Sequence, residues 1–350
     1  MRKLVLMIAQ CLLLAGCTGL PTPREMGDMA LVRTMGVDGK GTALTLTAST
    51  GERAGGSEGE KQPPLILSGQ GSSLSAAAAR LRQKSDSWVF SAYTDQVILG
   101  REAELLPVLS WFAHDSELSL GANVWLLGEG TAAAAVEQGG ESGVEKRLAA
   151  LKRDARLGAA PMSRTAGEIY SSLLDRGCTF LPVLKEAGEL TPDGYALVKG
   201  GSVTAFLREE EARGLELLCE QPMAEVVEVS LPEGNISVRL TGGQLDCRPR
   251  FAGEELRKLE LRSRVTARLS QWERAPTPAQ REEIAARVEQ QLHAQLTAAL
   301  TRLQKEGAEC VGIGSRVAIA APWHWAKLEH RWQEVFSTVD WELEVRVALD

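Results

Sequence analysis

The order of apolar and polar positions along the chain predicts a mixture of β-strands and helices. Two β-type runs surround the turn "DGKG" between residues 25 and 50, and "PLILSGQG", "DQVILG" and "GANVWLLGEG" indicate further strands. Helices are predicted from the serines of "SSLSAAAARLRQKS", over "REAELLPVLSWFAHD", and around 143–154 and 163–176. The polar stretch "GERAGGSEGEKQ" (51–62) has no core-forming residue and is interpreted as a mobile loop.

The pattern changes near residue 224, after a hairpin and a charged helix predicted in "YALVKGGSVTAFLREEEARGLELL". Successive β-type runs follow, broken by turns at "PEGN" and "TGG" and continued by "RKLELRSRVTARLSQWE". A long helix is predicted next, with Thr277 as N-cap, Pro278 in the first position and Gln280 completing a capping box, until Gly307 ends it. A strand at "GSRVAIAAP", a tryptophan-rich helix over 323–336 and a strand at "VDWELEVRVAL" complete the chain.

This mixture, without strict β-α-β alternation, predicts a multi-domain α+β fold with mixed or antiparallel sheets packed against long helices. We expect a signal peptide over 1–16, a lipidated tether over 17–24 and an N-terminal α+β region over 25–220, with room for two subdomains. A C-terminal α+β domain is expected over 224–350, with the long helix at 278–306. The boundary is placed near 219–224.

The first residues have the layout of a secretory leader. Arg2 and Lys3 precede an apolar run, Leu4 to Ala15, that is too short for a membrane-spanning helix. The run ends in Leu14-Ala15-Gly16-Cys17, which matches all four positions of a bacterial lipobox. An ordinary signal peptide with a chance cysteine is the alternative. We interpret Cys17 as the lipidation site, where two or three acyl chains, each worth about 0.8 kcal/mol per buried CH₂, would hold the chain at a bilayer.

The net charge of the chain restricts the kinds of partner that it can bind. The sequence has 39 lysines and arginines against 46 acidic residues, and removal of Arg2 and Lys3 with the leader brings the net charge from −7 to about −9. An acidic chain without a basic cluster argues against nucleic acid and against electrostatic binding of anionic lipid. The lipid on Cys17 would therefore supply the anchoring.

Four cysteines follow the anchor: Cys178, Cys219, Cys247 and Cys310. They form no C-x-x-C pair and stand apart from histidine clusters, so neither a zinc site nor a redox site is expected. An extracytoplasmic location permits disulfides in three connectivities, but buried free thiols are the favoured interpretation.

The sequence contains no recognisable catalytic motif. The glycines of 51–62 lack the ending of a phosphate loop, and neither a G-x-S-x-G elbow nor an H-E-x-x-H pair is present. "HDSE" (114–117) brings together acid–base groups, but it falls where a helix ends, so polar caps are the favoured interpretation. We therefore expect no catalytic residue, no cofactor other than the lipid and no metal site.

The C-terminal aromatic residues allow two interpretations. Trp323, Trp325, Trp332 and Trp341 could form a stacking surface for a ligand, but tryptophans at helical spacing more often belong to a core, which we favour. His324 and His330 are six residues apart and are expected to border these rings rather than bind metal.

Several of these blocks resemble the Ger(x)C family, the lipoprotein C subunits of spore germinant receptors. After the lipobox, "REMGDMALVRTMGVD" is similar to the family's opening, with Glu25, Met29, Ala30, Gly36 and Asp38 in place, although the tryptophan common after the lipobox cysteine is missing. "GQGSSLSAAAARL", "DQVILGREAEL" and "LSWFAHDSELSLGANVWLLGEGTAAAAVE" are similar to later blocks, with Ala113-His114 departing from the usual basic residue. "GGSVTAFLREEEARGLELL" is similar to another block in shortened form.

The most specific block is the C-terminal one. Gly312-Ile313-Gly314 is followed, at the family's spacing, by Trp325, Trp332 and Phe336, while the aspartate common before the glycine is replaced around Glu309-Cys310. These residues belong to cores and turns, and none identifies a binding site.

The resemblance implies a non-enzymatic subunit on the outer face of the inner spore membrane, acting with an A-type subunit and a B-type integral membrane subunit in sensing nutrients. The alternative is a free-standing solute-binding lipoprotein. That class has two similar lobes with a hinge, whereas the two halves predicted here differ.

Overall fold

The structure, a computed structural model, describes residues 29–54, 61–139, 143–155, 160–186, 188–221, 226–232, 234–272 and 275–350. Its strands are β1 (Met29–Leu31), β2 (Thr34–Lys40), β3 (Ala43–Ser49), β4 (Arg53–Ala54), β5 (Lys61–Gln62), β6 (Ile66–Gly71), β7 (Trp88–Phe90), β8 (Gln96–Leu99), β9 (Asn123–Leu127), β10 (Cys178–Glu186), β11 (Leu190–Lys199), β12 (Ser202–Leu207), β13 (Val226–Leu231), β14 (Gly234–Ala252), β15 (Glu255–Gln271) and β16 (Asp340–Leu349). Its helices are α2 (Leu74–Gln83), α3 (Leu105–His114), α4 (Ala132–Glu137), α5 (Val144–Ala155), α6 (Ala166–Arg176), α7 (Glu209–Leu218), α8 (Pro278–Glu306), α9 (Ile313–Ala320), α10 (Pro322–Leu328), the 3₁₀ turn η3 (Glu329–Arg331) and α11 (Trp332–Thr338). The strands and helices confirm the α+β fold.

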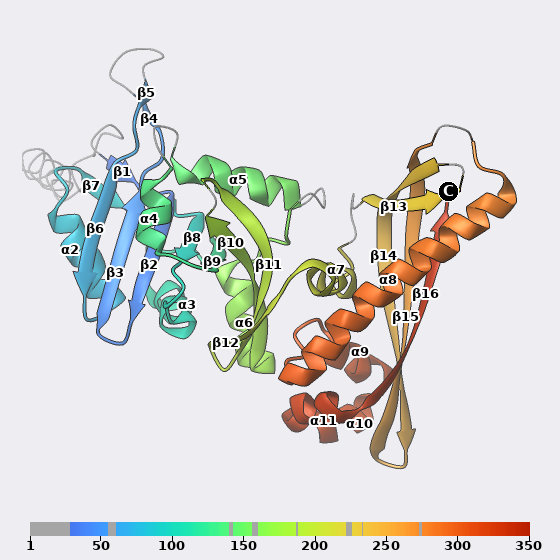
Figure 1. Cartoon of the computed structure of the whole chain (residues 1–350). Coiled ribbons are helices and arrows are strands. Elements are labelled where there is room, and N and C mark those ends of the chain that lie inside the picture. Colours follow the sequence, from blue (N-terminus) through green and yellow to red (C-terminus); the bar gives the residue numbers. More distant parts are fainter. Residues whose placement is uncertain are drawn as a thin grey trace, which may run out of the picture.

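The N-terminal half is built on a mixed sheet of eight strands in the described part of the chain. The strand order is β12-β11-β10-β9-β8-β2-β3-β6, with β2, β8, β9 and β10 parallel and the flanking strands antiparallel. The central strands β8 and β9 are buried along their whole length, as apolar runs such as "QVIL" require for a sheet covered on both faces. Helices cover both faces, with α2, α3 and α6 contributing to one apolar core and α4 and α5 to another (Figure 1).

The C-terminal half is a second sheet, with β13, β14, β15 and β16 in that order among the described residues. β14 and β15 form a long hairpin, and β16 returns to pair in parallel with β15 after the helices α8 to α11 (Figure 1). Buried and exposed positions alternate along most of β15, because only one face of this sheet packs against helices. α8 lies along that face, and its buried positions include Ile284, Val288, Leu292 and Leu296.

The predicted start and end of α8 are confirmed. The Thr277 hydroxyl accepts a hydrogen bond from the Gln280 N–H at 3.3 Å, and the Gln280 side chain accepts one from the Thr277 N–H at 2.9 Å. Gly307 ends the helix in the left-handed conformation, with φ of 56°.

The two sheets are joined by a shared apolar core. Side chains of β10, β11, β12 and α7, such as Phe180, Leu197 and Leu215, belong to the same buried cluster as those of α8 and the C-terminal sheet. α7 packs directly against α8, where a Cβ on Gly214 would lie 2.0 Å from the Gln295 carbonyl oxygen. The packing therefore requires glycine there.

Three local predictions were wrong. "GSRVAIAAP" forms helix α9 rather than a strand, because a short apolar run fits both structures and a buried carboxylate, described below, caps a helix at this position. "TGG" (241–243) is no turn: β14 continues through it with a register shift between Leu240 and Gly242, as glycine permits at a bulge. Within 51–62, predicted as a loop, β4 and β5 pair antiparallel.

The tryptophan-rich helix was predicted as one element, and it is divided. α10 ends at Leu328, the 3₁₀ turn η3 follows, and α11 begins at Trp332. The break bends the chain back, so that Trp325 and Trp332 lie against each other with ring centroids 5.3 Å apart.

Candidate functional site

The residues singled out near the N-terminus fix one helix to the sheet. The Asp38 carboxylate accepts hydrogen bonds from the N–H groups of Ala132 at 2.7 Å and Ala133 at 2.8 Å, in the first turn of α4. Gly36 lies below it, where an added Cβ would approach Ala132 to 3.1 Å. Both residues therefore hold β2 against α4, and neither is left free to bind a ligand.

The C-terminal block is organised by the carboxylate of Glu309, which the sequence showed only as a replacement for the family's aspartate, without a predicted role. Glu309 is 1% exposed. Its Oε1 accepts the N–H groups of Val311 and Ile313, both at 2.9 Å, and its Oε2 accepts the N–H of Gly314 at 3.0 Å and the indole N–H of Trp332 at 2.9 Å. Three backbone donors at the start of α9, where the helix dipole favours an anion, and the Trp332 indole of α11 compensate the buried carboxylate.

The two glycines of this block have separate functions. Gly312 adopts φ of 85°, a conformation that favours glycine, just before α9 begins. A Cβ on Gly314 would lie 2.7 Å from Nε1 of Trp332 and 2.9 Å from the ring of Trp325. Gly312 therefore allows the turn into α9, and Gly314 allows the two indoles to close over it.

Trp332 and Phe336 are buried as predicted, with ring centroids 6.1 Å apart, and Trp325 is partly buried against them. Trp341 donates its indole N–H to Oε1 of Gln304 at 2.7 Å. Trp323 is the exception to the predicted core, because it is 86% exposed.

Gln333 connects this block to the N-terminal half. Its Oε1 accepts the N–H of Glu309 at 2.7 Å, and its Nε2 lies 3.1 Å from the carbonyl oxygens of Arg176 and Glu309 and 3.2 Å from Sγ of Cys178. Nη1 of Arg176 donates to the Cys310 carbonyl at 3.2 Å. The end of α6 and the start of β10 are thus hydrogen-bonded to the C-terminal helices.

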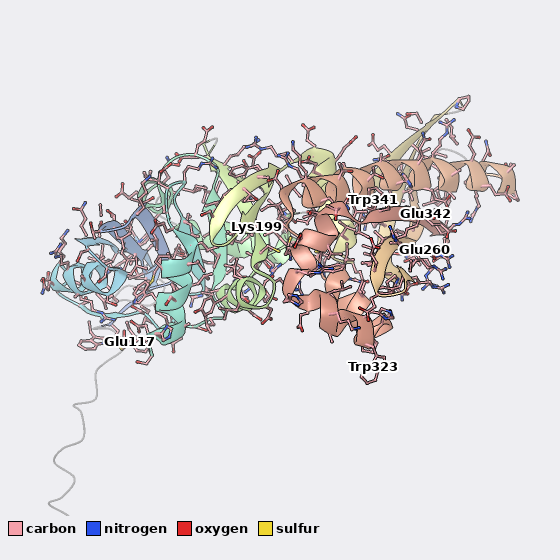
Figure 2. The ribbon with its side chains drawn as sticks, turned by 90° about the horizontal axis from the view of Figure 1, so that it is seen from below. Glu117, Lys199, Glu260, Trp323, Trp341 and Glu342 are labelled. Carbon is pink, nitrogen blue, oxygen red and sulfur yellow. The ribbon has the colours of Figure 1, made fainter. Side chains whose placement is uncertain are left out.

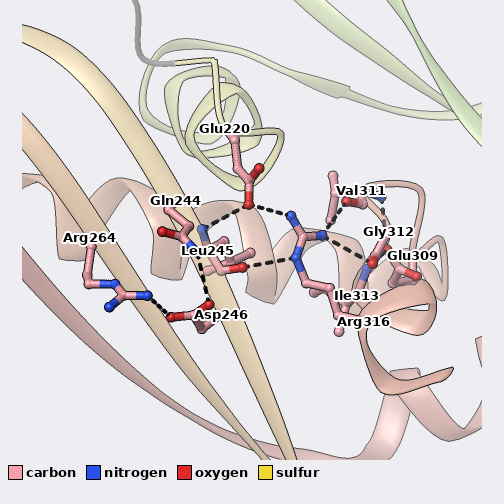
Figure 3. A network of polar contacts seen from close by, with 10 residues as sticks. All are labelled: Glu220, Gln244, Leu245, Asp246, Arg264, Glu309, Val311, Gly312, Ile313 and Arg316. Carbon is pink, nitrogen blue, oxygen red and sulfur yellow. Dashed lines mark hydrogen bonds and ion pairs between the residues drawn. The ribbon is translucent and has the colours of Figure 1, made fainter. Parts of the chain in front are cut away.

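A second network surrounds Arg316 of α9 (Figure 3). Its Nε donates to the Leu245 carbonyl at 3.0 Å, its Nη1 to the Gly312 carbonyl at 3.1 Å, and its Nη2 to Oε1 of Glu220 at 2.8 Å. Partial burial raises the pKa of Glu220, but hydrogen bonds from the Leu245 N–H and from Arg316 outweigh it and lower the pKa below its ordinary value. The network ties the segment after α7 to β14 and α9.

A hollow of about 740 Å³ opens beside Gln333, between the end of α6 and the C-terminal helices. Its wall is formed by Asp175, Arg176, Glu309, Gly314, Ser315, Ala318, Ile319, Trp325 and residues 329–334, and we call it the junction hollow. Its lining combines aromatic rings with several charged side chains. The lining also includes Arg176 and Gln333, which connect the two halves. It is the candidate interaction site of the described structure.

The other sequence candidates form no catalytic group. In "HDSE", the His114 ring lies 2.7 Å from the Ser110 carbonyl, Asp115 accepts the Glu117 N–H at 2.9 Å, and Glu117 pairs with Arg82. His324 stacks on Phe251 with centroids 4.0 Å apart. Among the described residues, no three histidine, cysteine or acidic side chains are grouped so as to hold a metal ion.

The four cysteines after the leader are free thiols, in agreement with the favoured interpretation. Burial raises the pKa of Cys178, Cys219 and Cys247 to about 12, and that of Cys310 well above its ordinary value. They stay protonated and poorly nucleophilic near neutral pH.

The lipobox Leu14-Ala15-Gly16-Cys17 and Glu25 lie outside the described residues, so the predicted anchor stays a prediction. Of the helices in the described ranges, none combines the length and the apolar character that crossing a bilayer requires.

The fold and the site define an α+β protein whose two main sheets are joined through a shared apolar core and buried polar residues. Residues 23–186 match a family model described as "Spore germination protein N-terminal domain", and residues 193–350 match one described as "Spore germination B3/ GerAC like, C-terminal". The chain therefore belongs to the GerAC-like, or Ger(x)C, family of spore germination proteins.

A solved structure supports the same fold. The chain is similar to a structure described as "Crystal Structure of the GerBC protein", with a TM-score of 0.62, 14% sequence identity, and coverage of 90% of this chain and 96% of that chain. The comparison with curated protein sequences gave no match.

Proposed function

We propose that this chain is the lipid-anchored subunit of a nutrient germinant receptor, acting with an A-type and a B-type membrane subunit on the outer face of the inner spore membrane. The observation that carries the proposal is that two spore-germination family models together cover residues 23–350 apart from a six-residue gap at 187–192. The lipobox ending in Cys17 supports the membrane location.

The proposed role is assembly rather than catalysis, and it requires no cofactor beyond the lipid on Cys17. The buried carboxylate of Glu309 has four hydrogen-bond donors, and Asp38 caps a helix, so these acids stabilise the fold. The four free thiols, with their raised pKa values, are unsuited to nucleophilic attack.

The anchor is tested with Cys17→Ala in sporulating cells, with the conservative change Thr18→Ser as control. We expect Cys17→Ala to move the chain from the membrane fraction to the soluble fraction and to slow nutrient-triggered germination, while Thr18→Ser leaves both unchanged. A Cys17→Ala chain that stays in the membrane, in spores that germinate normally, contradicts the proposal. Tight binding of a nutrient by the purified chain alone would instead favour a solute-binding lipoprotein.

A further inference from the structure

The two most exposed large apolar side chains of the described residues lie close together in the sequence, and one of them lines the junction hollow. Ile319, in the last turn of α9, is 84% exposed, and Trp323, in the first turn of α10, is 86% exposed. Ile319 itself lines the hollow, whereas Trp323 lies outside its lining, at the start of the helix that contributes Trp325 to it. Figure 2 shows Trp323 projecting away from the ribbon. Exposed apolar groups of this size beside a concave surface are typical of protein-binding sites.

Several charged side chains on the wall of the hollow have no partner among the described residues. The side chains of Glu329, Arg331 and Glu334 have no hydrogen bond or ion pair with any described residue. Among the described residues, the Asp175 carboxylate accepts a hydrogen bond only from the Ser171 hydroxyl, at 3.0 Å. Carboxylates therefore predominate in the lining, which contains Asp175, Glu329, Glu334 and the buried Glu309 together with two arginines, Arg176 and Arg331, and one histidine, His330.

We propose that the junction hollow and the exposed side chains of Ile319 and Trp323 together bind a segment of a membrane-embedded receptor subunit, in which apolar side chains surround a basic residue. This inference rests on the proposed assembly with membrane subunits. The apolar side chains of the segment cover Ile319 and Trp323. The basic side chain stacks on the Trp325 ring and pairs with the carboxylates of Glu329 and Glu334.

A protein segment fits this surface better than a lipid bilayer does. A bilayer would accept Trp323, but it would also bring the unpaired carboxylates of Glu329 and Glu334 towards anionic head groups, which repel them. A basic residue in the bound segment compensates these carboxylates directly.

Because the hollow lies between the two halves, binding there affects how they are held together. Its wall includes Arg176 of the N-terminal half and Trp332 and Gln333 of the C-terminal half, and Gln333 hydrogen-bonds both parts. A segment bound there contacts both halves at once and stabilises their present arrangement.

The test is co-purification of the full, lipidated chain with an epitope-tagged B-type subunit from detergent-solubilised spore membranes. We expect Trp323→Ala and Ile319→Ser each to lower the co-purified amount by about tenfold or more, as truncation of an interface hot spot does. Trp272→Ala is the matched control, because Trp272 is also exposed but lies at the end of β15, and it should leave the amount unchanged. Unchanged urea-unfolding midpoints of the purified variants show that the fold is intact.

The charge is tested with the double variant Glu329→Gln with Glu334→Gln, against Glu282→Gln on the exposed side of α8. We expect the double variant to lower co-purification severalfold and Glu282→Gln to have no effect. Stronger co-purification of the double variant would overturn the assignment of a basic segment.

Two outcomes separate this inference from the proposed function. If wild type co-purifies and Trp323→Ala co-purifies equally well, the surface is wrong but the receptor assembly stands; if wild type fails to co-purify, both are overturned. A full chain carrying Cys17→Ser tests the bilayer, with vesicles of phosphatidylethanolamine and phosphatidylglycerol. If it binds these vesicles and loses binding with Trp323→Ala, the occupant is lipid and the inference is overturned.

Discussion

At the scale of single residues, the C-terminal block depends on a buried carboxylate that accepts four hydrogen bonds. Glu309 stands where the family resemblance leads one to expect an aspartate before the glycines, and its side chain reaches both the start of α9 and the Trp332 indole. If any of its donors were lost, this carboxylate would destabilise the fold, because a buried charge without partners is strongly destabilising.

Glu309→Gln tests this arrangement. The variant keeps the size of the side chain but turns an NH₂ group towards N–H donors, so we expect the free energy of unfolding to fall by about 2–4 kcal/mol. Urea unfolding followed by tryptophan fluorescence measures it. Glu282→Gln is the control and should change stability by less than about 0.5 kcal/mol. An equally small effect of Glu309→Gln would show that the four hydrogen bonds contribute little.

Glu220 gives a prediction about pH. Its pKa in the folded state lies below the ordinary value of 4.5, so the carboxylate stabilises the fold above that pH, and this contribution is lost as the pH falls through the folded pKa. The stability difference between wild type and Glu220→Gln should therefore be constant from pH 7 to about pH 5 and shrink at lower pH. Because the side chain is 38% exposed, we expect at most about 1 kcal/mol. A difference that grows on acidification contradicts the assignment.

At the scale of elements, the sequence predicted most strands and helices because their periodicity is clear. The capping box at Thr277 and the glycine at 307 gave α8 to within a residue, and the alternation along "VDWELEVRVAL" gave β16. α9 could not be predicted from its short apolar run, because its helical start depends on Glu309 and on Trp332, which is 23 residues further along the chain. The hydrogen-bonding roles of Gln333 and Arg316 were not predicted for the same reason. The neighbouring sequence does not distinguish a glutamine or an arginine that hydrogen-bonds to distant backbone carbonyls from any other.

α9 and α10 can pack closely because Gly314 has no side chain. Gly314→Ala would place a methyl group 2.7 Å from Nε1 of Trp332 and displace the indole from Glu309, so we expect a loss of about 1–3 kcal/mol in unfolding free energy. Differential scanning calorimetry measures the loss. Ser315→Ala, at the neighbouring exposed position, should change the melting temperature little. Equal effects of the two substitutions would mean that the indole can shift without cost.

At the scale of the whole molecule, the shared apolar core and the hydrogen bonds of Gln333 make the two sheets one structural unit. The predicted boundary near 219–224 follows α7, yet α7 packs on α8 and its side chains belong to the C-terminal core. The family models instead divide the chain between residues 186 and 193. Composition alone conveys little about such a junction, because it is formed by contacts between residues far apart in sequence.

Gln333→Leu tests how strongly the junction couples the halves. Leucine has a similar volume but leaves the Glu309 N–H and the Arg176 carbonyl without their partner, so we expect faster amide hydrogen exchange at the start of β10 and at residues 309–311. Hydrogen exchange read by mass spectrometry measures it. Gln290→Leu, at an exposed position of α8, should leave the exchange unchanged. Unaltered exchange in Gln333→Leu would show that the apolar core alone couples the halves.

The parallel pairing of β16 with β15 also fixes an order of events during synthesis. β15 ends at Gln271, but the strand that covers its edge begins at Asp340, after the whole helical segment. Until Asp340–Leu349 has been synthesised, Lys258–Ala267 of β15, the residues that pair with it, present an open edge that can pair with another chain. The C-terminal sheet therefore closes only after Asp340–Leu349 has been added, and a chain interrupted before Asp340 should aggregate rather than accumulate in a shortened form.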